Sequence, residues 1–307
     1  MTNRTIEQLA VDWSKFDPWR IQAVQHRLGE HHLLQPDQLI ELGRRLETGG
    51  LVRTHSDKAT AGTPFNDAPS MHPNRKSAEE TLQRIRDAGA WMSLLNVQTD
   101  SVYRNLVDAI IDEVRPHVER QDPGVCYRGG WIFITSPNAV TPFHIDKEHN
   151  FILQVRGTKK LYVWDHRDVE VCSEEARDRF HFDHSRELIK WRDEFKQRAQ
   201  VFHLQPGQGA YMPSTSPHMV ENDDNPSITV SFTYYTDATR RNSRLHALHQ
   251  RMRKAGMSPA AVGTRSASDA LLGSLTAIGS GVRDTVARLR DSSARTDTAR
   301  YAHAKVG

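Results

Sequence analysis

The spacing of hydrophobic residues changes along the chain near residue 120. Before that point, Gln22–Leu28 and Pro36–Leu46 carry apolar residues three and four positions apart, and Pro36 stands where a helix would begin. Ser77-Ala-Glu-Glu80 has the pattern of a helix capping box, and Tyr103–Val114 is a further amphipathic segment. We therefore expect residues 1–120 to be mostly helical, with a long loop over Thr54–Lys76, which is rich in Gly, Thr, Pro and Asn.

After Cys126 the pattern changes to short runs of β-branched and aromatic residues separated by Gly, Pro and Asn. The runs that we expect to form strands are Trp131–Thr135, Asn150–Val155, Lys160–Trp164, Val201–Leu204, Gly209–Met212 and Ser227–Tyr235. Many short strands with regular turn signals are typical of a sandwich or barrel. The charged segment 173–200 has a helical pattern, so it is predicted to be an insertion in a β domain that spans residues 121–237.

Two more helices are expected in residues 238–307. The first is basic, with its arginine and lysine residues between Arg240 and Lys254 spread around the helix, which favours a solvated helix over a surface for nucleic acid. The second, Ser268–Arg290, carries an apolar stripe that must cover something, either the protein's own N-terminal helices or a second copy. We expect a homodimer through this helix, and a frayed end over Ser292–Gly307.

Composition and charge exclude several classes of protein. At 307 residues, with 37% hydrophobic and 26% charged residues, the chain can bury a substantial core. The longest apolar runs are too short to cross a membrane, and Met1–Phe16 lacks the apolar segment of a secretory signal. Two cysteines, Cys126 and Cys172, fit a reducing compartment, so we expect a cytoplasmic protein. A net charge of +3 indicates no particular partner.

The segment Thr141-Pro-Phe-His144-Ile-Asp146 contains a candidate pair of metal ligands. Residues two apart in a strand project from the same face, so His144 and Asp146 can reach one point together. With a second, distant imidazole they would form the two-histidine, one-carboxylate set that leaves three positions open on ferrous iron. A structural zinc site would instead close its coordination sphere. The His-x-Asp pattern alone is common, so its neighbours decide its meaning.

A predicted hairpin follows this segment. Asn150–Val155 is a strand and Arg156-Gly-Thr158 a tight turn, so the returning strand begins at Lys159 beside the strand that carries Asp146. A lysine that points into a barrel is costly unless it meets an anion. Alternation places Lys159 on one face and Lys160 on the other, and position alone does not decide which of the two points inward.

Together these motifs resemble the JmjC branch of the cupins, and within it the small hydroxylases typified by the asparaginyl hydroxylase of the hypoxia-inducible factor. The resemblance covers about Tyr127 to Tyr235 and includes Pro206-Gly and Tyr-Met-Pro ahead of His218. It implies an α+β protein with a mainly β core, a double-stranded β-helix of the cupin or jelly-roll type, flanked by N-terminal and C-terminal helices. The implied Fe(II) ligands are His144, Asp146 and His218. The residues implied to bind the co-substrate 2-oxoglutarate are Thr141, Lys159, Asn150 and Ser231.

The function implied by this resemblance is a dioxygenase that uses Fe(II), 2-oxoglutarate and dioxygen to hydroxylate an unactivated C–H bond. A peptide or protein side chain is the expected substrate, and a free amino acid or small metabolite is the alternative. A non-catalytic cupin that binds metal as a sensor is the second alternative. Gln208 and Ser216-Pro217 depart from the family pattern, so the family's substrate preference does not carry over. His149 has an odd offset from His144 and should point to the opposite face; His181, His184 and His203 are expected to be ordinary polar residues.

Overall fold

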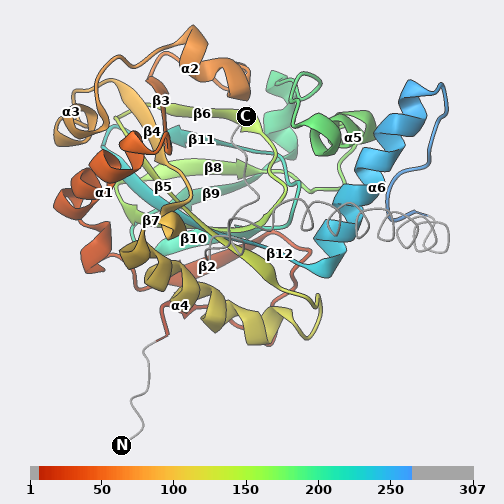
Figure 1. Cartoon of the computed structure of the whole chain (residues 1–307), viewed down its shortest axis with the longest axis horizontal. Coiled ribbons are helices and arrows are strands. Elements are labelled where there is room, and N and C mark those ends of the chain that lie inside the picture. The colour runs from red at the N-terminus through yellow and green to blue at the C-terminus, as the bar shows by residue number, and fades with distance from the viewer. Residues whose placement is uncertain (1–6, 265–307) are drawn as a thin grey trace, which may run out of the picture.

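Two antiparallel sheets packed face to face form the core of residues 7–264, which the computed structural model describes (Figure 1). The larger sheet has the strand order β1-β2-β10-β7-β12-β5-β4-β3, and the smaller sheet has the order β6-β11-β8-β9. Ile152, Ala210 and Met212 of the larger sheet pack between the sheets against Leu161, Val163 and Val220 of the smaller one. This arrangement is the jelly-roll core with flanking helices that the sequence predicts.

The strands and helices have the following bounds. The strands are β1 (Leu9–Ala10), β2 (Gln22–His26), β3 (Val52–Ser56), β4 (Ala90–Leu94), β5 (Cys126–Thr135), β6 (Val140–His144), β7 (His149–Arg156), β8 (Lys159–Val163), β9 (Gln200–Leu204), β10 (Gln208–Met212), β11 (His218–Asn222) and β12 (Ser227–Tyr235). The α-helices are α1 (Pro36–Thr48), α2 (Ala68–Met71), α3 (Ala78–Gln83), α4 (Ser101–Val118), α5 (Glu174–Asp183) and α6 (Asp237–Lys254). Short 3-10 turns are η1 (His32–Leu34), η2 (Phe65–Asp67), η3 (Val97–Thr99) and η4 (Asp193–Arg198).

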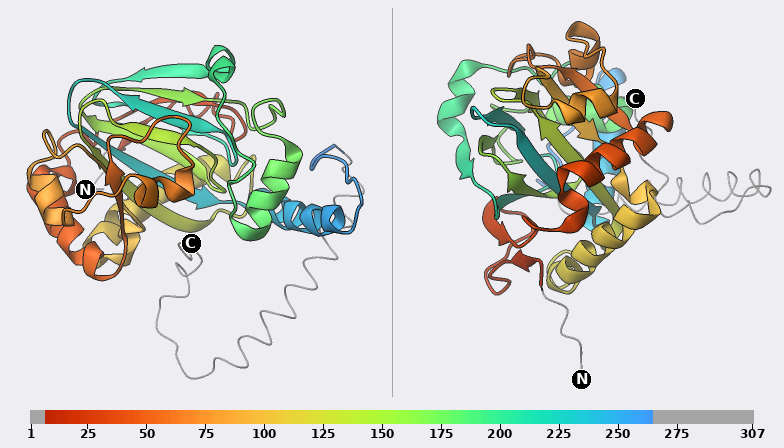
Figure 2. Two further views of the ribbon diagram at one scale, coloured as in Figure 1. Left: turned by 90° about the horizontal axis from the view of Figure 1, so that it is seen from above. Right: turned by 90° about the vertical axis from the view of Figure 1, so that its left-hand side faces the viewer.

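Helices α1 and α4 cover the face of the larger sheet that is turned away from the smaller one (Figures 1 and 2). The apolar stripe of α4, with Val107, Ile110 and Ile111, joins one cluster with Ile132 of β5 and Val230 of β12. Burial of side chains of this size stabilises the fold by roughly 1.5–3 kcal/mol each. Within residues 7–264 no helix is both long and apolar enough to cross a membrane.

Most of the predicted elements are present. Pro36 is the first residue of α1, the side chains of Ser77 and Glu80 cap α3 reciprocally, and the helix predicted over Tyr103–Val114 lies within α4. All of the predicted strands are found with shifts of a few residues, and 173–200 contains α5 and η4. The hairpin predicted from Asn150–Val155 to Lys159 is wrong, because β7 belongs to the larger sheet and β8 to the smaller one, where β11 separates β8 from β6. The apolar stripe of Ser268–Arg290, and with it the expected dimer helix, lies outside the described residues.

The helix predicted over Gln22–Leu28 is wrong, because Gln22–His26 forms strand β2 between β1 and β10. Val24 and His26 are buried while Ala23 and Gln25 are exposed, so the segment alternates with the period of a strand. So short a segment matches helical and strand spacing almost equally, and pairing with β10 decides the outcome. The predicted loop Thr54–Lys76 is a loop only in part, since it holds the end of β3, the turn η2 and helix α2.

Helices α5 and α6 pack against each other at one end of the sandwich (Figure 1). Their contact is polar: the fully buried Asp178 of α5 binds Nδ1 of His246 at 2.7 Å and Nε of Arg253 at 2.8 Å. The rings of His181 and His246 stack with their centroids 4.8 Å apart. Helix α5 also contributes to the wall of the cavity beside the candidate metal ligands, which is described below. This ionic contact therefore positions part of that site.

We expect Asp178→Ala to lower the free energy of unfolding by about 3–5 kcal/mol, because it leaves the charge of Arg253 in a partly buried place without its carboxylate. Urea denaturation followed by circular dichroism measures this change. Asp183→Ala is the matched control in the same helix: it removes only a partly exposed pair with Arg179 and should cost less than about 1 kcal/mol. Equal losses in the two variants would contradict the assignment.

Candidate metal centre

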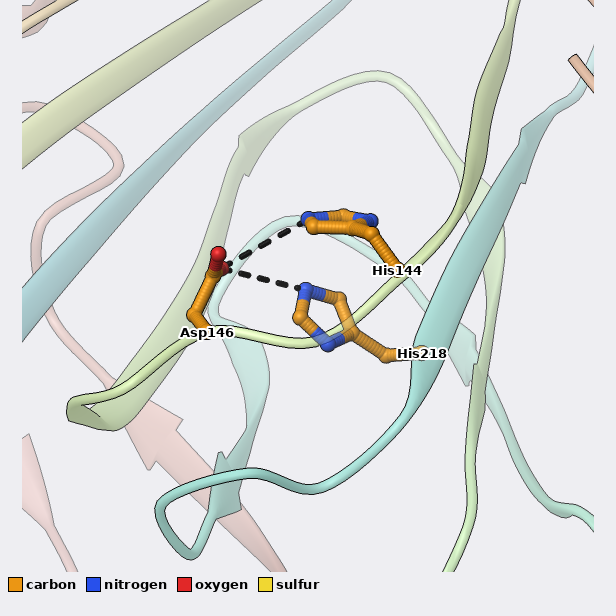
Figure 3. A group of neighbouring side chains, drawn as sticks. All are labelled: His144, Asp146 and His218. Atoms are coloured by element: carbon orange, nitrogen blue, oxygen red, sulfur yellow. Dashed lines mark ion pairs between the residues drawn. The ribbon is translucent and has the colours of Figure 1, made fainter. Parts of the chain in front are cut away.

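Three side chains from two neighbouring strands and the turn after one of them meet at one point (Figure 3). In the antiparallel pair β6–β11, His144 lies directly opposite His218. The Nε2 atoms of His144 and His218 lie 3.5 Å and 3.6 Å from Oδ2 of Asp146. The ligand atoms of all three residues lie within 4.8 Å of one another, which is the spacing needed to share one metal ion. Strand β6 ends at His144, so Asp146 belongs to the turn rather than to the strand that we predicted.

Hydrogen bonds to backbone carbonyls fix the orientation of both imidazoles. Nδ1 of His144 lies 2.8 Å from the carbonyl oxygen of Pro142, and Nδ1 of His218 lies 3.0 Å from that of Ser216. Each Nδ1 must carry the proton in such a contact, which leaves the lone pair of Nε2 for a metal. Burial and the neighbouring His144 lower the pKa of His218 to about 3, so its ring is neutral. The ring of Phe65 stacks on His144 with centroids 3.9 Å apart.

Asp146 is held by its backbone and by an arginine. Its carbonyl oxygen accepts a hydrogen bond from the amide of Thr215 at 2.8 Å, and Nη2 of Arg186 donates to its Oδ1 at 3.0 Å. Burial alone would raise the pKa of the Asp146 carboxyl, but His144, His218 and Arg186 together hold it well below its usual value. Asp146 is therefore a carboxylate with Oδ1 on Arg186 and Oδ2 directed at the histidines.

Arg186 ties several segments to this carboxylate. It also donates to the carbonyl oxygen of Ile145 at 3.0 Å and to Oδ1 of Asn66 at 2.8 Å. Its guanidinium lies over the rings of Phe65 and Phe180, 4.9 Å and 4.5 Å from their centroids. The insertion between β8 and β9 thus reaches back onto the metal ligands through one side chain.

The residues implied to bind a keto acid lie inside the sandwich. Lys159 is 4% exposed, and no residue in 7–264 forms a hydrogen bond or ion pair with its side-chain ammonium group. Burial lowers the pKa of Lys159 to about 7. Oγ1 of Thr141 accepts a hydrogen bond from the indole nitrogen of Trp91 at 2.8 Å. Asn150 and Ser231 are buried, and Oδ1 of Asn150 and Oγ of Ser231 have no partner within the described residues.

The alternation along β8 is therefore settled, because Lys159 is buried while Lys160 is partly exposed. The side chains of His144, Asp146 and His218 lie against one another. Within residues 7–264, the side chains of Thr141, Lys159, Asn150 and Ser231 form no hydrogen bond or ion pair with these three.

A cavity of about 270 Å³ opens beside the metal ligands. Residues from β3, β4, β5, β12, η2, α5, the loop after α5 and the turn after β6 line it, among them Arg53, Ser93, Trp131, Phe65, Arg186 and Tyr235. None of these residues stood out as a site residue in the sequence. They come from the N-terminal region, from strands β5 and β12 and from the insertion, with no recognisable spacing to the histidines. Only the fold brings them to the site.

The other histidines have separate surroundings. His149 points away from the metal ligands as expected: its Nδ1 lies 2.8 Å from the hydroxyl of Tyr211 and its Nε2 lies 3.4 Å from Asp122. Glu174, Asp178 and His246 form a second group with metal-like spacing. Arg177 pairs with Glu174 and Arg253 pairs with Asp178, so the two carboxylates are already balanced by two guanidiniums. We interpret this second group as part of the contact between α5 and α6.

The chain is similar to several solved structures, all at low sequence identity. No curated protein sequence matches the chain. Among solved structures, the ribosomal oxygenase YcfD of Escherichia coli in complex with cobalt and 2-oxoglutarate is 16% identical, over 84% of this chain and 61% of that chain, with a TM-score of 0.46. The same protein with cobalt and succinic acid is 17% identical, over 88% and 68% of the two chains, with a TM-score of 0.44. The DMSP lyase DddQ of Ruegeria pomeroyi is 12% identical over 36% and 39%, with a TM-score of 0.23.

The match to YcfD in complex with 2-oxoglutarate spans about three fifths of the length of that chain. A family model for a cupin-like domain matches residues 6–240. That range includes both sheets and every residue implied as a metal or keto-acid ligand. Because the match covers well over half of the sequence, this chain belongs to the family of cupin-like domains.

Proposed function

We propose that this protein is a dioxygenase that depends on Fe(II) and 2-oxoglutarate and hydroxylates an unactivated C–H bond. The observation that carries the proposal is the convergence of His144, Asp146 and His218 on one point. The same sandwich encloses Lys159, whose ammonium group has no partner among the described residues. A metal site explains the three ligands, and a dicarboxylate co-substrate explains the lysine. A cupin that only binds metal would need the first feature and not the second.

The residues present fit a ferrous ion. Two neutral imidazoles and one carboxylate, all on one side of the ion, are the donor set that non-haem iron oxygenases use. His144, Asp146 and His218 would hold the metal, and the cavity that His144 and Asp146 line leaves open space beside them. When bound, the iron and the keto acid together supply the oxidising chemistry.

The protein's own side chains would bind and orient the co-substrate. Lys159 would pair with the distal carboxylate of 2-oxoglutarate, which offsets the cost of its burial. Trp91 already donates to Oγ1 of Thr141, so the hydroxyl hydrogen of Thr141 is directed elsewhere and can be donated to the same carboxylate. Asn150 and Ser231 offer further buried polar atoms on the inner face of the larger sheet. Phe65 and Phe180 shield the metal ligands and Arg186 from water.

The substrate class, the cellular location, the oligomeric state and the division of the chain into regions are proposals or predictions. On the resemblance noted in the sequence, we propose a peptide or protein side chain as the substrate, in a cytoplasmic protein. A homodimer through Ser268–Arg290 likewise stays a prediction. The division into an N-terminal region, a β domain over 121–237 and C-terminal helices also stays a prediction, although β1–β4 show that the N-terminal region contributes strands to the larger sheet.

The metal assignment predicts that His144→Ala and Asp146→Ala abolish stoichiometric binding of Fe(II), because two remaining ligands cannot hold a labile ion as three do. Anaerobic titration followed by metal analysis measures the stoichiometry. His203→Ala, which removes an exposed histidine from β9, is the control and should bind one ion as the parent does. Undiminished binding in either ligand variant would exclude the site.

The co-substrate assignment predicts that Lys159→Met weakens the binding of 2-oxoglutarate by about 2–5 kcal/mol, the range for loss of a buried charge pair. The same change should stabilise the ligand-free protein, because it removes a buried charge that has no partner among the described residues. Anaerobic calorimetry on the metal-loaded protein and urea denaturation measure the two effects. Lys160→Met, on the partly exposed side of β8, is the matched control and should change neither.

The pH dependence of this binding has a defined sign. The pKa of ligand-free Lys159 is lowered by burial to about 7, and pairing with a carboxylate raises it again. Affinity for 2-oxoglutarate should therefore be full below pH 7 and should fall as pH rises above 7, since a proton must then be taken up on binding. In Lys159→Met this dependence should be absent; if it persists, another group is responsible.

Arg186 is expected to be a positioning residue for the metal. Arg186→Gln should lower the affinity for Co(II) about 10- to 100-fold, the usual cost of losing a residue that orients a metal ligand. It should also change the visible spectrum of bound Co(II), because Oδ1 of Asp146 is then free to turn toward the ion. Arg179→Gln, which removes a partly exposed arginine of α5, is the control. Identical affinity and spectra in the two variants would contradict this role.

A further inference from the structure

The inner face of the larger sheet holds an unusual concentration of polar atoms without partners. Within residues 7–264, buried atoms that lack a hydrogen bond include Nε of Arg53, Oγ of Ser93, Nε1 of Trp131, Oδ1 of Asn150, Oγ of Ser231 and Oγ1 of Thr233. All six residues lie on inward-facing positions of β3, β4, β5, β7 and β12. A buried polar group left without a hydrogen bond is unfavourable, so a set of this size points to a place where a ligand binds.

These atoms fall into two groups along the sheet. Asn150, Ser231 and Thr233 lie on the central strands β7 and β12 and do not line the cavity beside the metal ligands. Arg53, Ser93 and Trp131 lie on β3, β4 and β5 and do line it. A keto acid held by Lys159 accounts for the first group and leaves the second without a ligand.

Arg53 and Ser93 form the centre of the second group. They are directly opposite each other in the antiparallel pair β3–β4, so their side chains leave the same face as close neighbours. Nη2 of Arg53 donates to the carbonyl oxygen of Phe65, and its guanidinium lies 4.6 Å from the centre of the Phe65 ring. Nε of Arg53 and the hydroxyl of Ser93 remain available. The indole N–H of Trp131 is near the Tyr127 hydroxyl without hydrogen-bond geometry.

The charges around the cavity leave Arg53 without an anion. Among the acids that line the cavity, Asp146 is bound to Arg186, Asp183 pairs with Arg179 at 3.0 Å, and Glu148 accepts from the hydroxyl of Tyr235 at 2.7 Å. No described carboxylate lies within ion-pair distance of Arg53.

Lys147, also in the wall, contacts the carbonyl of His181 and the ring of His184 rather than an acid. The adjoining cavity, which shares Lys147, His184 and Tyr235 with this one, adds Arg240 and Arg244. Arg240 pairs with Asp237 at 3.6 Å, whereas Lys147 and Arg244 have no carboxylate within ion-pair distance among residues 7–264. The approach to the metal ligands is therefore rich in positive charge.

We propose that Arg53 and Ser93 form a subsite for a carboxylate of the molecule that is oxidised, so that the substrate is an acid. The inference rests on the proposed oxygenase function and deepens it. A guanidinium presents a planar set of donors that matches a carboxylate, and the hydroxyl of Ser93 adds a third hydrogen bond beside it. Because His144 and Asp146 line the same cavity, the carboxylate lies near the C–H bond that reacts. The acid is either a free molecule or an acidic side chain of a peptide.

The test compares matched acids and amides on protein saturated with Fe(II) and 2-oxoglutarate without oxygen. One arm titrates N-acetylglycine against N-acetylglycinamide, and the other titrates the blocked peptides acetyl-Ala-Asp-Ala-amide and acetyl-Ala-Asn-Ala-amide. We expect the acid to bind roughly ten- to a hundredfold more tightly than its amide in at least one arm, the factor for a hydrogen-bonded charge. Preference in the first arm alone identifies a free acid, and preference in the second identifies a peptide.

Variants assign the preference to the subsite. Arg53→Gln should abolish it, Ser93→Ala should weaken it, and Arg156→Gln, an exposed strand arginine outside this cavity, should leave it unchanged. The affinity for 2-oxoglutarate should stay within about twofold in Arg53→Gln. Equal binding of acid and amide in both arms, including binding of neither, overturns the proposal. A preference that survives Arg53→Gln, or a loss of 2-oxoglutarate affinity in that variant, overturns it as well.

The same titrations on metal-free protein separate this proposal from the proposed function. If the parent binds neither Fe(II) nor 2-oxoglutarate, the oxygenase assignment fails, and the acid–amide comparison on metal-free protein still decides whether the subsite exists.

Discussion

The antiparallel register between β6 and β11 is the constraint on which the centre depends. It places His144 opposite His218, and a slip of one residue would turn one histidine to the other face of the sheet. The pairing is irregular at one place: His218 lies opposite His144, but Val220 lies opposite Thr141. Two residues of β6, Pro142 and Phe143, therefore stand where β11 has only one. Strand β6 is at the edge of the smaller sheet, where a proline lacking an N–H is tolerated. This irregularity re-aims the end of β6, so that Asp146 turns back onto both imidazoles.

A second theme is the number of buried polar groups that the described part of the chain does not satisfy by itself. Lys159 on the smaller sheet and Arg53 on the larger one are cations without a carboxylate partner among residues 7–264. Lys159 reduces the stability of the ligand-free protein, since a buried charge without a partner is unfavourable. Arg53 is only partly buried and donates to the carbonyl oxygen of Phe65, so its cost is smaller. Such groups are typical of sites that recognise ligands, where stability is given up for binding. The two cations lie on opposite sheets and only Arg53 lines the cavity beside the metal ligands, so they would bind two different acids at separate places.

Local patterns predicted the parts of the site that depend on local geometry. Alternation along β8 predicted that Lys159 and Lys160 face opposite ways, and the His-x-Asp spacing predicted that His144 and Asp146 converge. Resemblance to a known family was needed to connect His218, because it is separated from His144 by the whole insertion. Arg186 and Arg53 could not be predicted, since only the tertiary fold brings the insertion and β3 to the metal ligands. The error at Gln22–Leu28 has the same origin, because pairing with distant β10 decides that segment.

The pairing of β2 with β10 has a consequence for how the chain is made. Ala23 lies opposite Ala210, so β2 leaves the ribosome long before its partner exists. At about 5–20 residues per second, the wait is roughly ten to forty seconds. During that time β2 is an open strand that could pair with another nascent chain. Its sequence, Gln-Ala-Val-Gln-His, has a single large apolar residue, which makes it a poor template for aggregation. The polar character of β2 therefore protects it from aggregation until the larger sheet can be completed.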